Sequence, residues 1–187
     1  RGSRLDEMLN ILTMFSKNDE VKYEGKHFKI NTNPVFKNIK EAQNYPILCV
    51  CHGRSNIKNQ FIRAAKHQGL ISISDYPHEF RFAIDQMTEY GNSFNTVEKQ
   101  SQSVFYMTIN INKDHANAEQ EADSFIKQYY GVNIWGDRWG PYGESQKIID
   151  RVNKYIEAGA TTIIFRFASF NQIEQLQRFC NQIQKNI

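Results

Sequence analysis

The sequence is poor in cysteine, and the cysteines that it has follow no known binding pattern. Its 187 residues contain three of them. Cys49 and Cys51 alternate within an apolar run, and Cys180 stands far along the chain. A disulfide framework or a structural zinc site needs more cysteines at paired spacings. We therefore expect reduced thiols and a cytoplasmic protein.

Net charge and long apolar segments are also scarce. The formal net charge is +3, which is too small and too dispersed to indicate a nucleic acid or a membrane surface as partner. No apolar run approaches the roughly 20 residues needed to cross a bilayer. The first residues lack the basic and then apolar order of a signal peptide. The sequence thus predicts no nucleic-acid partner and no membrane association.

Compact catalytic motifs are missing as well. The sequence contains no phosphate-binding P-loop, no glycine-rich dinucleotide fingerprint and no nucleophile elbow. His67 and His78 are not spaced with carboxylates as zinc ligands are, and His115 follows Asp114 at a predicted helix start. We therefore predict no metal site, and no side chain is identified as catalytic.

What the sequence does contain is a regular alternation of apolar runs and amphipathic segments. The runs show no polar alternation, which is typical of strands buried on both faces of a parallel sheet. An amphipathic segment with a helical period follows each run. The predicted strands are 46–51, 70–74, 103–111 and 161–165. The predicted helices begin near Ser55, Pro77, Asp114 and Glu144, and a last helix closes the chain.

Three details of these helices can be tested. Ser55 is expected to cap the first of them, Gly69 to stop it, and Gly159 to end the helix from 144 to 158. The last helix is expected to turn an apolar stripe toward the sheet. That stripe consists of Ile173, Leu176, Phe179 and Ile183.

The first 45 residues have a different pattern. A helical stripe begins within the opening RGSRLDEMLNILTMF, which suggests that the chain continues a longer protein, although a processed or tagged terminus could also begin this way. The segment VKYEGKHFKI then predicts a hairpin around Glu24 and Gly25. We expect residues 20–45 to be a hairpin and loop insertion in one domain that spans 1–187.

Strands that alternate with helices at this spacing predict an α/β fold of parallel βα units with right-handed crossovers. A closed TIM (β/α)8 barrel usually needs about 250 residues. The four units found here therefore predict a half barrel or a small open sheet. A half barrel leaves two strand edges that another chain or segment must cover.

Four stretches, taken in order, suggest a family. They are EGKHF, PILCVCHGRSNIKNQFIRAAKHQGLISIS, QYYGVNIWGDRWGPYG and DRVNKYIEAGATTIIFRFAS. Together they resemble the C-terminal half of bacterial luciferase-like, flavin-dependent monooxygenases, and the resemblance covers essentially the whole chain. It implies the C-terminal four βα units of a TIM barrel.

The resemblance also implies a function. Reduced FMN, supplied by a flavin reductase, would react with oxygen, and the product would oxygenate a small organic substrate. Two alternatives stay open: a deazaflavin-dependent hydride-transfer enzyme of the same superfamily, or a non-catalytic, truncated flavin-binding fragment. The implied partners are the missing N-terminal half barrel or a second copy of the chain.

The loop after the first buried strand is one candidate cofactor site. His52, Gly53, Arg54 and Ser55 precede a helix, where backbone amides bind anions and glycine allows close approach. In the family that the chain resembles, the corresponding loop approaches the flavin phosphate. His52 could also act as a base, or it could simply be a polar loop residue.

Further candidates follow the later strands. Arg166, Phe167 and Ser169 end the last strand, where barrel active sites lie, and Arg166 could bind a phosphate or an anionic substrate. A salt bridge to a neighbouring helix is the alternative for Arg166. In the stretch 129–143, Arg138 could steer an anion, while Trp139 and Trp135 could cover a flat ring or only seal the barrel rim. Weaker candidates end the second strand: Ser72, Ser74 and Asp75.

Overall fold

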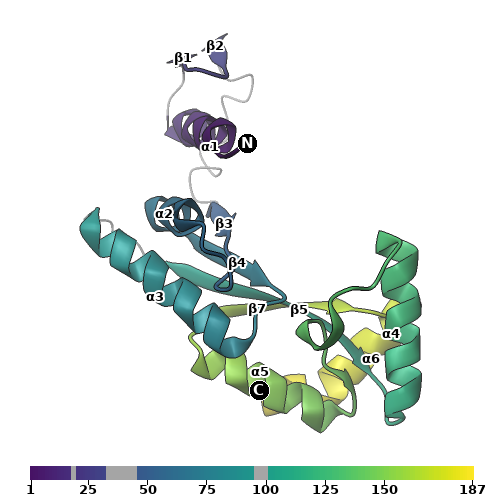
Figure 1. Cartoon of the computed structure of the whole chain (residues 1–187). Coiled ribbons are helices and arrows are strands. Elements are labelled where there is room, and N and C mark those ends of the chain that lie inside the picture. The colour runs from purple at the N-terminus through teal and green to yellow at the C-terminus, as the bar shows by residue number, and fades with distance from the viewer. Residues whose placement is uncertain (18–19, 33–45, 95–100) are drawn as a thin grey trace. The chain divides into compact units, whose positions relative to one another are not determined.

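A computed structural model describes residues 1–17, 20–32, 46–94 and 101–187 of the chain (Figure 1). It divides into two compact units, Arg1–Ile47 and Leu48–Ile187. The assignment of the whole chain to one barrel domain stays a prediction, and residues 33–45 of the predicted insertion lie outside the described residues.

The described residues of the first unit form a helix and a hairpin. Helix α1 spans Gly2–Lys17, and the antiparallel strands β1 (Val21–Glu24) and β2 (Lys29–Thr32) confirm the predicted hairpin. Glu7 on α1 accepts hydrogen bonds from the backbone amides of the turn, at 2.9 Å from Lys26, 2.9 Å from His27 and 3.1 Å from Phe28. This one carboxylate therefore ties the helix to the hairpin turn.

The second unit contains the parallel sheet, and the predicted α/β class is confirmed. In its described part the sheet has five strands, paired in parallel, with β3, β4, β5 and β7 side by side. The short strand β6, which was not predicted, pairs with the end of β5. The bounds are β3 Leu48–Val50, β4 Gly69–Ile73, β5 Gln102–Ile111, β6 Tyr142–Gly143 and β7 Thr162–Phe167.

Helices connect these strands in the predicted order. Their bounds are α2 Lys58–Lys66, α3 Pro77–Ser93, α4 His115–Tyr130, α5 Ser145–Glu157 and α6 Gln172–Gln182, with short 3-10 turns η2 Gly136–Arg138 and η3 Gln184–Asn186. Between β5 and β7 the chain forms both α4 and α5. Helix α5 packs on β5 as the crossover helix, whereas α4 packs beside β6 at the end of β5 (Figure 1). The extra helix thus lies near the carboxyl edge of the sheet, where sites of parallel sheets form.

The predicted helix ends are confirmed in part. Asp114 caps α4 by accepting the amide of Asn117 at 3.2 Å, and Gly159, with a φ of 101°, follows the end of α5. The prediction for Ser55 was wrong, because α2 begins at Lys58 and its N-cap residue is Ile57. Gly69 does not stop α2 but begins β4, where a side chain would collide with the carbonyl of Gln102.

Helix α6 shows a further correction. Ile173 and Leu176 were expected to face the sheet, yet they are 73% and 52% exposed. The buried stripe is shifted, because Gln175 turns inward and bonds both backbone groups of Ile111, at 2.8 and 3.2 Å. A polar side chain that bonds the backbone of the last residue of β5 thereby accompanies the rotation of this helix.

The core beneath the sheet is aromatic. Phe80 of α3, Phe105 of β5 and Tyr155 of α5 are all buried. The rings of Phe105 and Tyr155 stack with centroids 3.7 Å apart, and Phe80 meets both of them edge-on. These three side chains join the sheet to the two helices that cover this face.

None of the helices formed by the described residues combines the length and the hydrophobicity that crossing a membrane requires.

Candidate functional site

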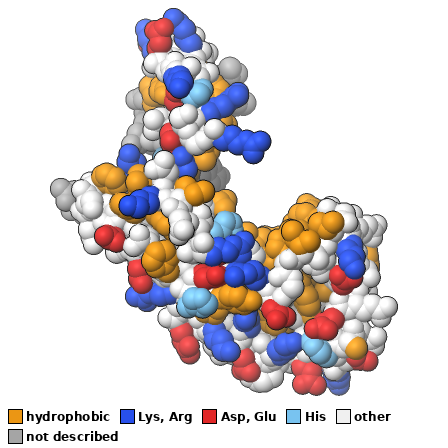
Figure 2. All heavy atoms as spheres, viewed as in Figure 1, with side chains coloured by type: hydrophobic (Ala, Val, Ile, Leu, Met, Phe, Trp, Pro, Cys, Tyr) orange, Lys and Arg blue, Asp and Glu red, His pale blue; other side chains and the backbone are white. Residues whose placement is uncertain are grey.

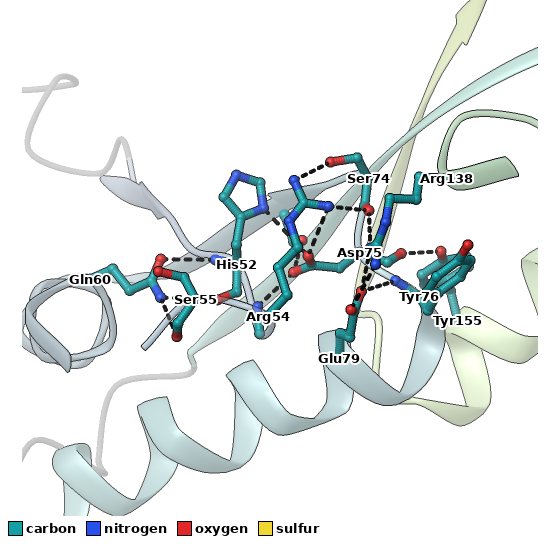
Figure 3. A network of polar contacts seen from close by, with 12 residues as sticks. His52, Arg54, Ser55, Gln60, Ser74, Asp75, Tyr76, Glu79, Arg138 and Tyr155 are labelled. Atoms are coloured by element: carbon teal, nitrogen blue, oxygen red, sulfur yellow. Dashed lines mark hydrogen bonds and ion pairs between the residues drawn. The ribbon is translucent and has the colours of Figure 1, made fainter. Parts of the chain in front are cut away.

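The candidate site lies where β3 and β4 end side by side. The amide of Cys51 bonds the carbonyl of Ile71 at 3.0 Å, so the parallel ladder continues to the residue before His52. Asp75 follows the end of β4 by two residues. Neighbouring parallel strands end at the same edge of a sheet. Residues 52–55 and 72–76 therefore meet, although they were predicted as separate candidates (Figure 3).

Asp75 is the centre of this arrangement. Its side chain is fully buried, and Oδ2 accepts hydrogen bonds from the Gly53 amide and the Ser72 hydroxyl, both at 2.8 Å. Oδ1 lies 3.5 Å from Nδ1 of His52 and 3.9 Å from a guanidinium nitrogen of Arg54. A buried carboxylate needs such partners, because an unpaired buried charge is costly.

Ser74 has an unusual backbone conformation. Its φ of 63° is in the left-handed region, which a serine seldom adopts. Its carbonyl accepts hydrogen bonds from Arg54 at 2.9 Å and from Arg138 at 3.0 Å, and its hydroxyl lies 3.1 Å from Arg54. Two arginines thus hold the strained residue in place. Strain of this kind is concentrated at functional sites.

The loop 52–55 is held from the other side by Gln60. This glutamine, which is 9% exposed, accepts the amide of His52 at 2.9 Å and donates to the carbonyls of His52 and Ser55 at 3.0 and 3.4 Å. The backbone amides of His52 and Gly53 are therefore already engaged by Gln60 and Asp75. Phosphate binding through these amides stays a prediction. The side chains of His52 and Arg54 remain 27% and 37% exposed.

Gly53 is required by the packing of this loop. A Cβ atom there would lie 1.7 Å from the carbonyl oxygen of Glu79 in the first turn of α3. The close approach of loop and helix is possible only because glycine has no side chain.

Arg138 is paired with Glu79. The two side chains form a bidentate contact of 2.6 and 3.0 Å, and the guanidinium lies over the Tyr76 ring at 4.3 Å. The hydrogen bonds from Arg138 lower the pKa of Glu79; burial opposes the shift, and the Tyr76 amide adds to it. Arg138 thus binds a carboxylate of this chain. A contact between Arg138 and the anion of a ligand stays a prediction.

Cys51, beside the loop, is a structural residue. Its thiol lies 3.3 Å from the carbonyl of Gln60. Burial raises its pKa to about 12, with Cys49 and Asp75 acting in the same direction. Because the thiolate is the reactive form, this cysteine is inert.

Arg166 forms a second cluster, at the end of β7. Its guanidinium donates to the Tyr130 hydroxyl at 2.7 Å and lies 4.7 Å from the Trp139 ring and 5.7 Å from the Tyr106 ring. Trp139 is 5% exposed and stacks on Trp135 with centroids 3.8 Å apart. Among the described residues Arg166 forms no ion pair with a carboxylate. Aromatic side chains therefore surround the Arg166 guanidinium, and they replace the salt bridge that was the alternative from the sequence.

Several polar atoms of this cluster are buried without a hydrogen-bond partner. They are Nε and one terminal nitrogen of Arg166, Nε1 of Trp139 and the Tyr142 hydroxyl. Burial raises the pKa of Tyr142, and Arg166 partly opposes this shift, so the phenol keeps its proton. Unpaired buried donors are rare in proteins, and a bound molecule or an ordered water can serve as their acceptor.

Ser169 forms hydrogen bonds within the chain. Its hydroxyl donates to Glu121 of α4 at 2.6 Å, and the other oxygen of Glu121 accepts from Asn110 of β5 at 2.8 Å. Although burial opposes it, hydrogen bonds from Ser169, Asn110 and the Phe170 amide lower the pKa of Glu121. In this structure Ser169 joins β7 to α4, and its contact with a ligand stays a prediction.

Sequence reasoning missed Gln60, Glu79 and Glu121. One signal could have found Glu79: it stands three residues after Tyr76, and its carboxylate accepts the Tyr76 amide at 2.7 Å, as in a capping box. Gln60 lies on the buried face of α2 beside Phe61, where a polar residue predicts a buried hydrogen bond. Nothing in the sequence marks Glu121.

The surface beside the two clusters is hollowed. In Figure 2 a concave region separates the charged side chains over the centre of the sheet unit from a hydrophobic rim on the right. Comparison with Figure 1 places this rim over the end of α4 and the segment after it. The exposed apolar residues of that part of the chain are Tyr129 (71%), Tyr130 (41%), Val132 (50%) and Ile134 (79%).

Comparisons with known proteins identify the fold. The sequence matches no protein-family model and no curated protein. An F420-dependent secondary alcohol dehydrogenase, solved with an F420-acetone adduct, superposes with a TM-score of 0.74 at 12% identity, over 97% of this chain and 61% of that one. The coenzyme F420-dependent tetrahydromethanopterin reductase from Methanopyrus kandleri gives a TM-score of 0.71 at 14% identity, over 97% and 62%.

A third similar structure is flavoprotein 390, with a TM-score of 0.52 at 15% identity, over 97% of this chain and 84% of that one. The chain thus spans less than two thirds of the length of the first two structures. At these identities the likeness concerns the fold. The α/β fold of this chain is that of a partial TIM-type barrel.

Proposed function

We propose that this chain is the C-terminal part of a deazaflavin-dependent oxidoreductase that transfers hydride between its cofactor and a small organic substrate. The fold shared with two F420-dependent enzymes is the observation that carries the proposal. It supports the hydride-transfer alternative better than FMN-dependent monooxygenation. Since the likeness spans only part of those chains, the activity is proposed for the complete barrel.

The residues present fit such a cofactor. A deazaflavin combines a flat ring that carries carbonyl oxygens with an anionic tail, so it needs aromatic faces, N–H donors and cations. The Arg166 cluster offers unpartnered guanidinium and indole N–H groups beside Trp139 and Tyr106. Arg54 offers a partly exposed cation after β3, at the same carboxyl edge of the sheet. Arg166, Trp139 and Arg54 are therefore the residues proposed to hold it, and when bound it would supply the hydride acceptor or donor.

Binding of F420 and of FMN to the wild-type protein tests the proposal. We expect micromolar or tighter binding of F420, weaker binding of FMN, and at least tenfold weaker F420 binding for Arg166→Met, because the guanidinium donors are lost. Fluorescence titration measures all three affinities. Arg81→Met is the matched control, since Arg81 pairs on the surface with Asp85. No F420 binding, or tighter FMN binding with oxygen consumption, would contradict the hydride-transfer proposal.

The strand edges predict a partner. Within the described residues, β3 pairs with β4 and β7 pairs with β5, so β3 and β7 are the outermost long strands of the described sheet. Exposed strand edges tend to pair with other chains. We propose that the remaining half of the barrel, or a second copy of the chain, covers these edges.

Sedimentation of the protein at several concentrations measures this association. The expected result is a species heavier than the 21.9 kDa of one chain. A well-behaved monomer over the whole concentration range would argue against the half barrel.

A further inference from the structure

We propose that His52 and Asp75 form an acid–base pair, in which His52 exchanges a proton with the substrate and Asp75 positions its ring. The inference rests on the proposed function, because hydride transfer at a carbon that carries oxygen requires a proton to move as well. In alcohol oxidation the C–H bond breaks, and its electron pair leaves with the hydride to the cofactor. The O–H proton passes to Nε2 of His52, and a C=O bond forms.

The geometry of Asp75 supports this assignment. Oδ2 is fully used, since it accepts from the Gly53 amide and the Ser72 hydroxyl. Oδ1 has no hydrogen-bond partner of ordinary length, and neither has Nδ1 of His52, although both atoms are buried. These two atoms face each other at 3.5 Å. Catalytic hydrogen bonds are often this long before the substrate binds.

The pairing determines the tautomer of His52. A carboxylate can only accept, so the proton of a neutral ring belongs on Nδ1, which faces Asp75. Nε2 then carries the free lone pair. The His52 side chain is 27% exposed, and Figure 3 shows its second ring nitrogen pointing away from Asp75 and out of the network. Nε2, the nitrogen proposed to act as the base, therefore lies on the exposed side of the ring, while the Asp75 carboxylate is buried.

The surroundings hold Asp75 in one place. The Tyr155 hydroxyl of α5 bonds the Asp75 carbonyl at 2.5 Å. Arg54 lies 3.9 Å from Oδ1 and shares the carboxylate with His52. Arg138 also reaches this segment through Ser74, but its charge is matched by Glu79. Because the Asp75 carboxylate and the loop backbone are both anchored, a small rotation of the His52 side chain is enough to close the 3.5 Å between Nδ1 and Oδ1 to hydrogen-bond distance.

The position of the pair suits this role. His52 follows β3 and Asp75 follows β4, and both lie at the carboxyl edge of the sheet, where βα folds bind substrates. The prediction from sequence named His52 as a base or a polar loop residue. A purely structural loop residue would not need to face a buried carboxylate oxygen that has no hydrogen-bond partner among the described residues.

The tautomer of His52 is the first test. Nitrogen NMR of 15N-histidine-labelled protein, with the His52 signals identified from a His52→Gln sample, should show the neutral ring protonated at Nδ1. In Asp75→Asn the proton should move to Nε2, because an amide can donate to Nδ1. Asp85→Asn, on the surface of α3, is the matched control and should leave the tautomer unchanged. A wild-type ring protonated at Nε2, or no change in a folded Asp75→Asn protein, would overturn the pairing.

Turnover by the assembled enzyme is the second test. His52→Gln should bind F420 within about twofold of wild type, while its oxidation of secondary alcohols should fall by about 100-fold. Unchanged turnover would refute the catalytic role and leave the proposed function standing. Failure of wild type to bind F420 would remove the proposed function and this catalytic role together, and the tautomer would still decide the pairing.

Discussion

Tyr155→Ala is expected to lower the free energy of unfolding by about 4 kcal/mol, since truncation of a buried aromatic side chain removes its packing and leaves a cavity. Tyr155 has no exposed surface, and its ring stacks on Phe105 at 3.7 Å and meets Phe80 at 6.0 Å. These contacts join α5, β5 and α3. Urea denaturation followed by circular dichroism measures the loss.

Tyr155→Phe separates the packing from the hydrogen bond. The ring is retained, but the bond from the hydroxyl to the Asp75 carbonyl is lost, so we expect a loss of about 1 kcal/mol. Burial raises the pKa of Tyr155 to about 12, so the phenol remains a donor at neutral pH; Arg151 opposes this shift. A Tyr155→Ala loss no larger than that of Tyr155→Phe would show that the aromatic core does not stabilise the sheet.

Arg138→Met is expected to cost about 2 to 3 kcal/mol. The side chains of Arg138 and Glu79 are 28% and 14% exposed. Removal of the guanidinium leaves the Tyr76 amide as the hydrogen-bond donor to the Glu79 carboxylate among the described residues. The same change releases the segment that carries Trp139 from the first turn of α3. Urea denaturation at neutral pH gives the value, and Arg81→Met, whose surface pair contributes little, is the matched control.

The pH dependence of stability distinguishes this ion pair from simple packing. The pKa of Glu79 is lower in the folded protein than its ordinary value of 4.5, first because of the hydrogen bonds from Arg138. The unfolded chain therefore binds the proton more readily. The stabilisation from this ion pair is complete above about pH 4.5. It is lost as the pH falls through the lower pKa that Glu79 has in the folded protein.

Denaturation at a series of acidic pH values measures this term. Wild type should lose more stability between neutral and acidic pH than Arg138→Met or Glu79→Gln does. Equal losses in all three proteins would show that the pair does not set the pKa of Glu79.

The sequence alone determined the succession of strands and helices in the sheet unit. Apolar runs marked β3, β4, β5 and β7, because the strands of a parallel sheet are rich in apolar residues. The expected burial on both faces does not hold throughout, since Ile164 of β7 is 41% exposed and β4 and β5 carry the buried polar residues Ser72 and Asn110. Amphipathic segments likewise marked α3 and α5, whose buried residues include Phe80 and Tyr155. Local patterns suffice here, since burial on one face imposes a period that a short segment already shows.

The tertiary structure decided the site. It joined Asp75, a weak candidate by sequence, to His52 and Arg54, and it matched Arg138 with Glu79, which is 59 residues away in the chain. It also rotated α6 so that Gln175 faces the sheet in place of Ile173. Such pairings depend on which strand ends lie side by side and on which backbone groups lack partners, and a local sequence pattern carries neither kind of information.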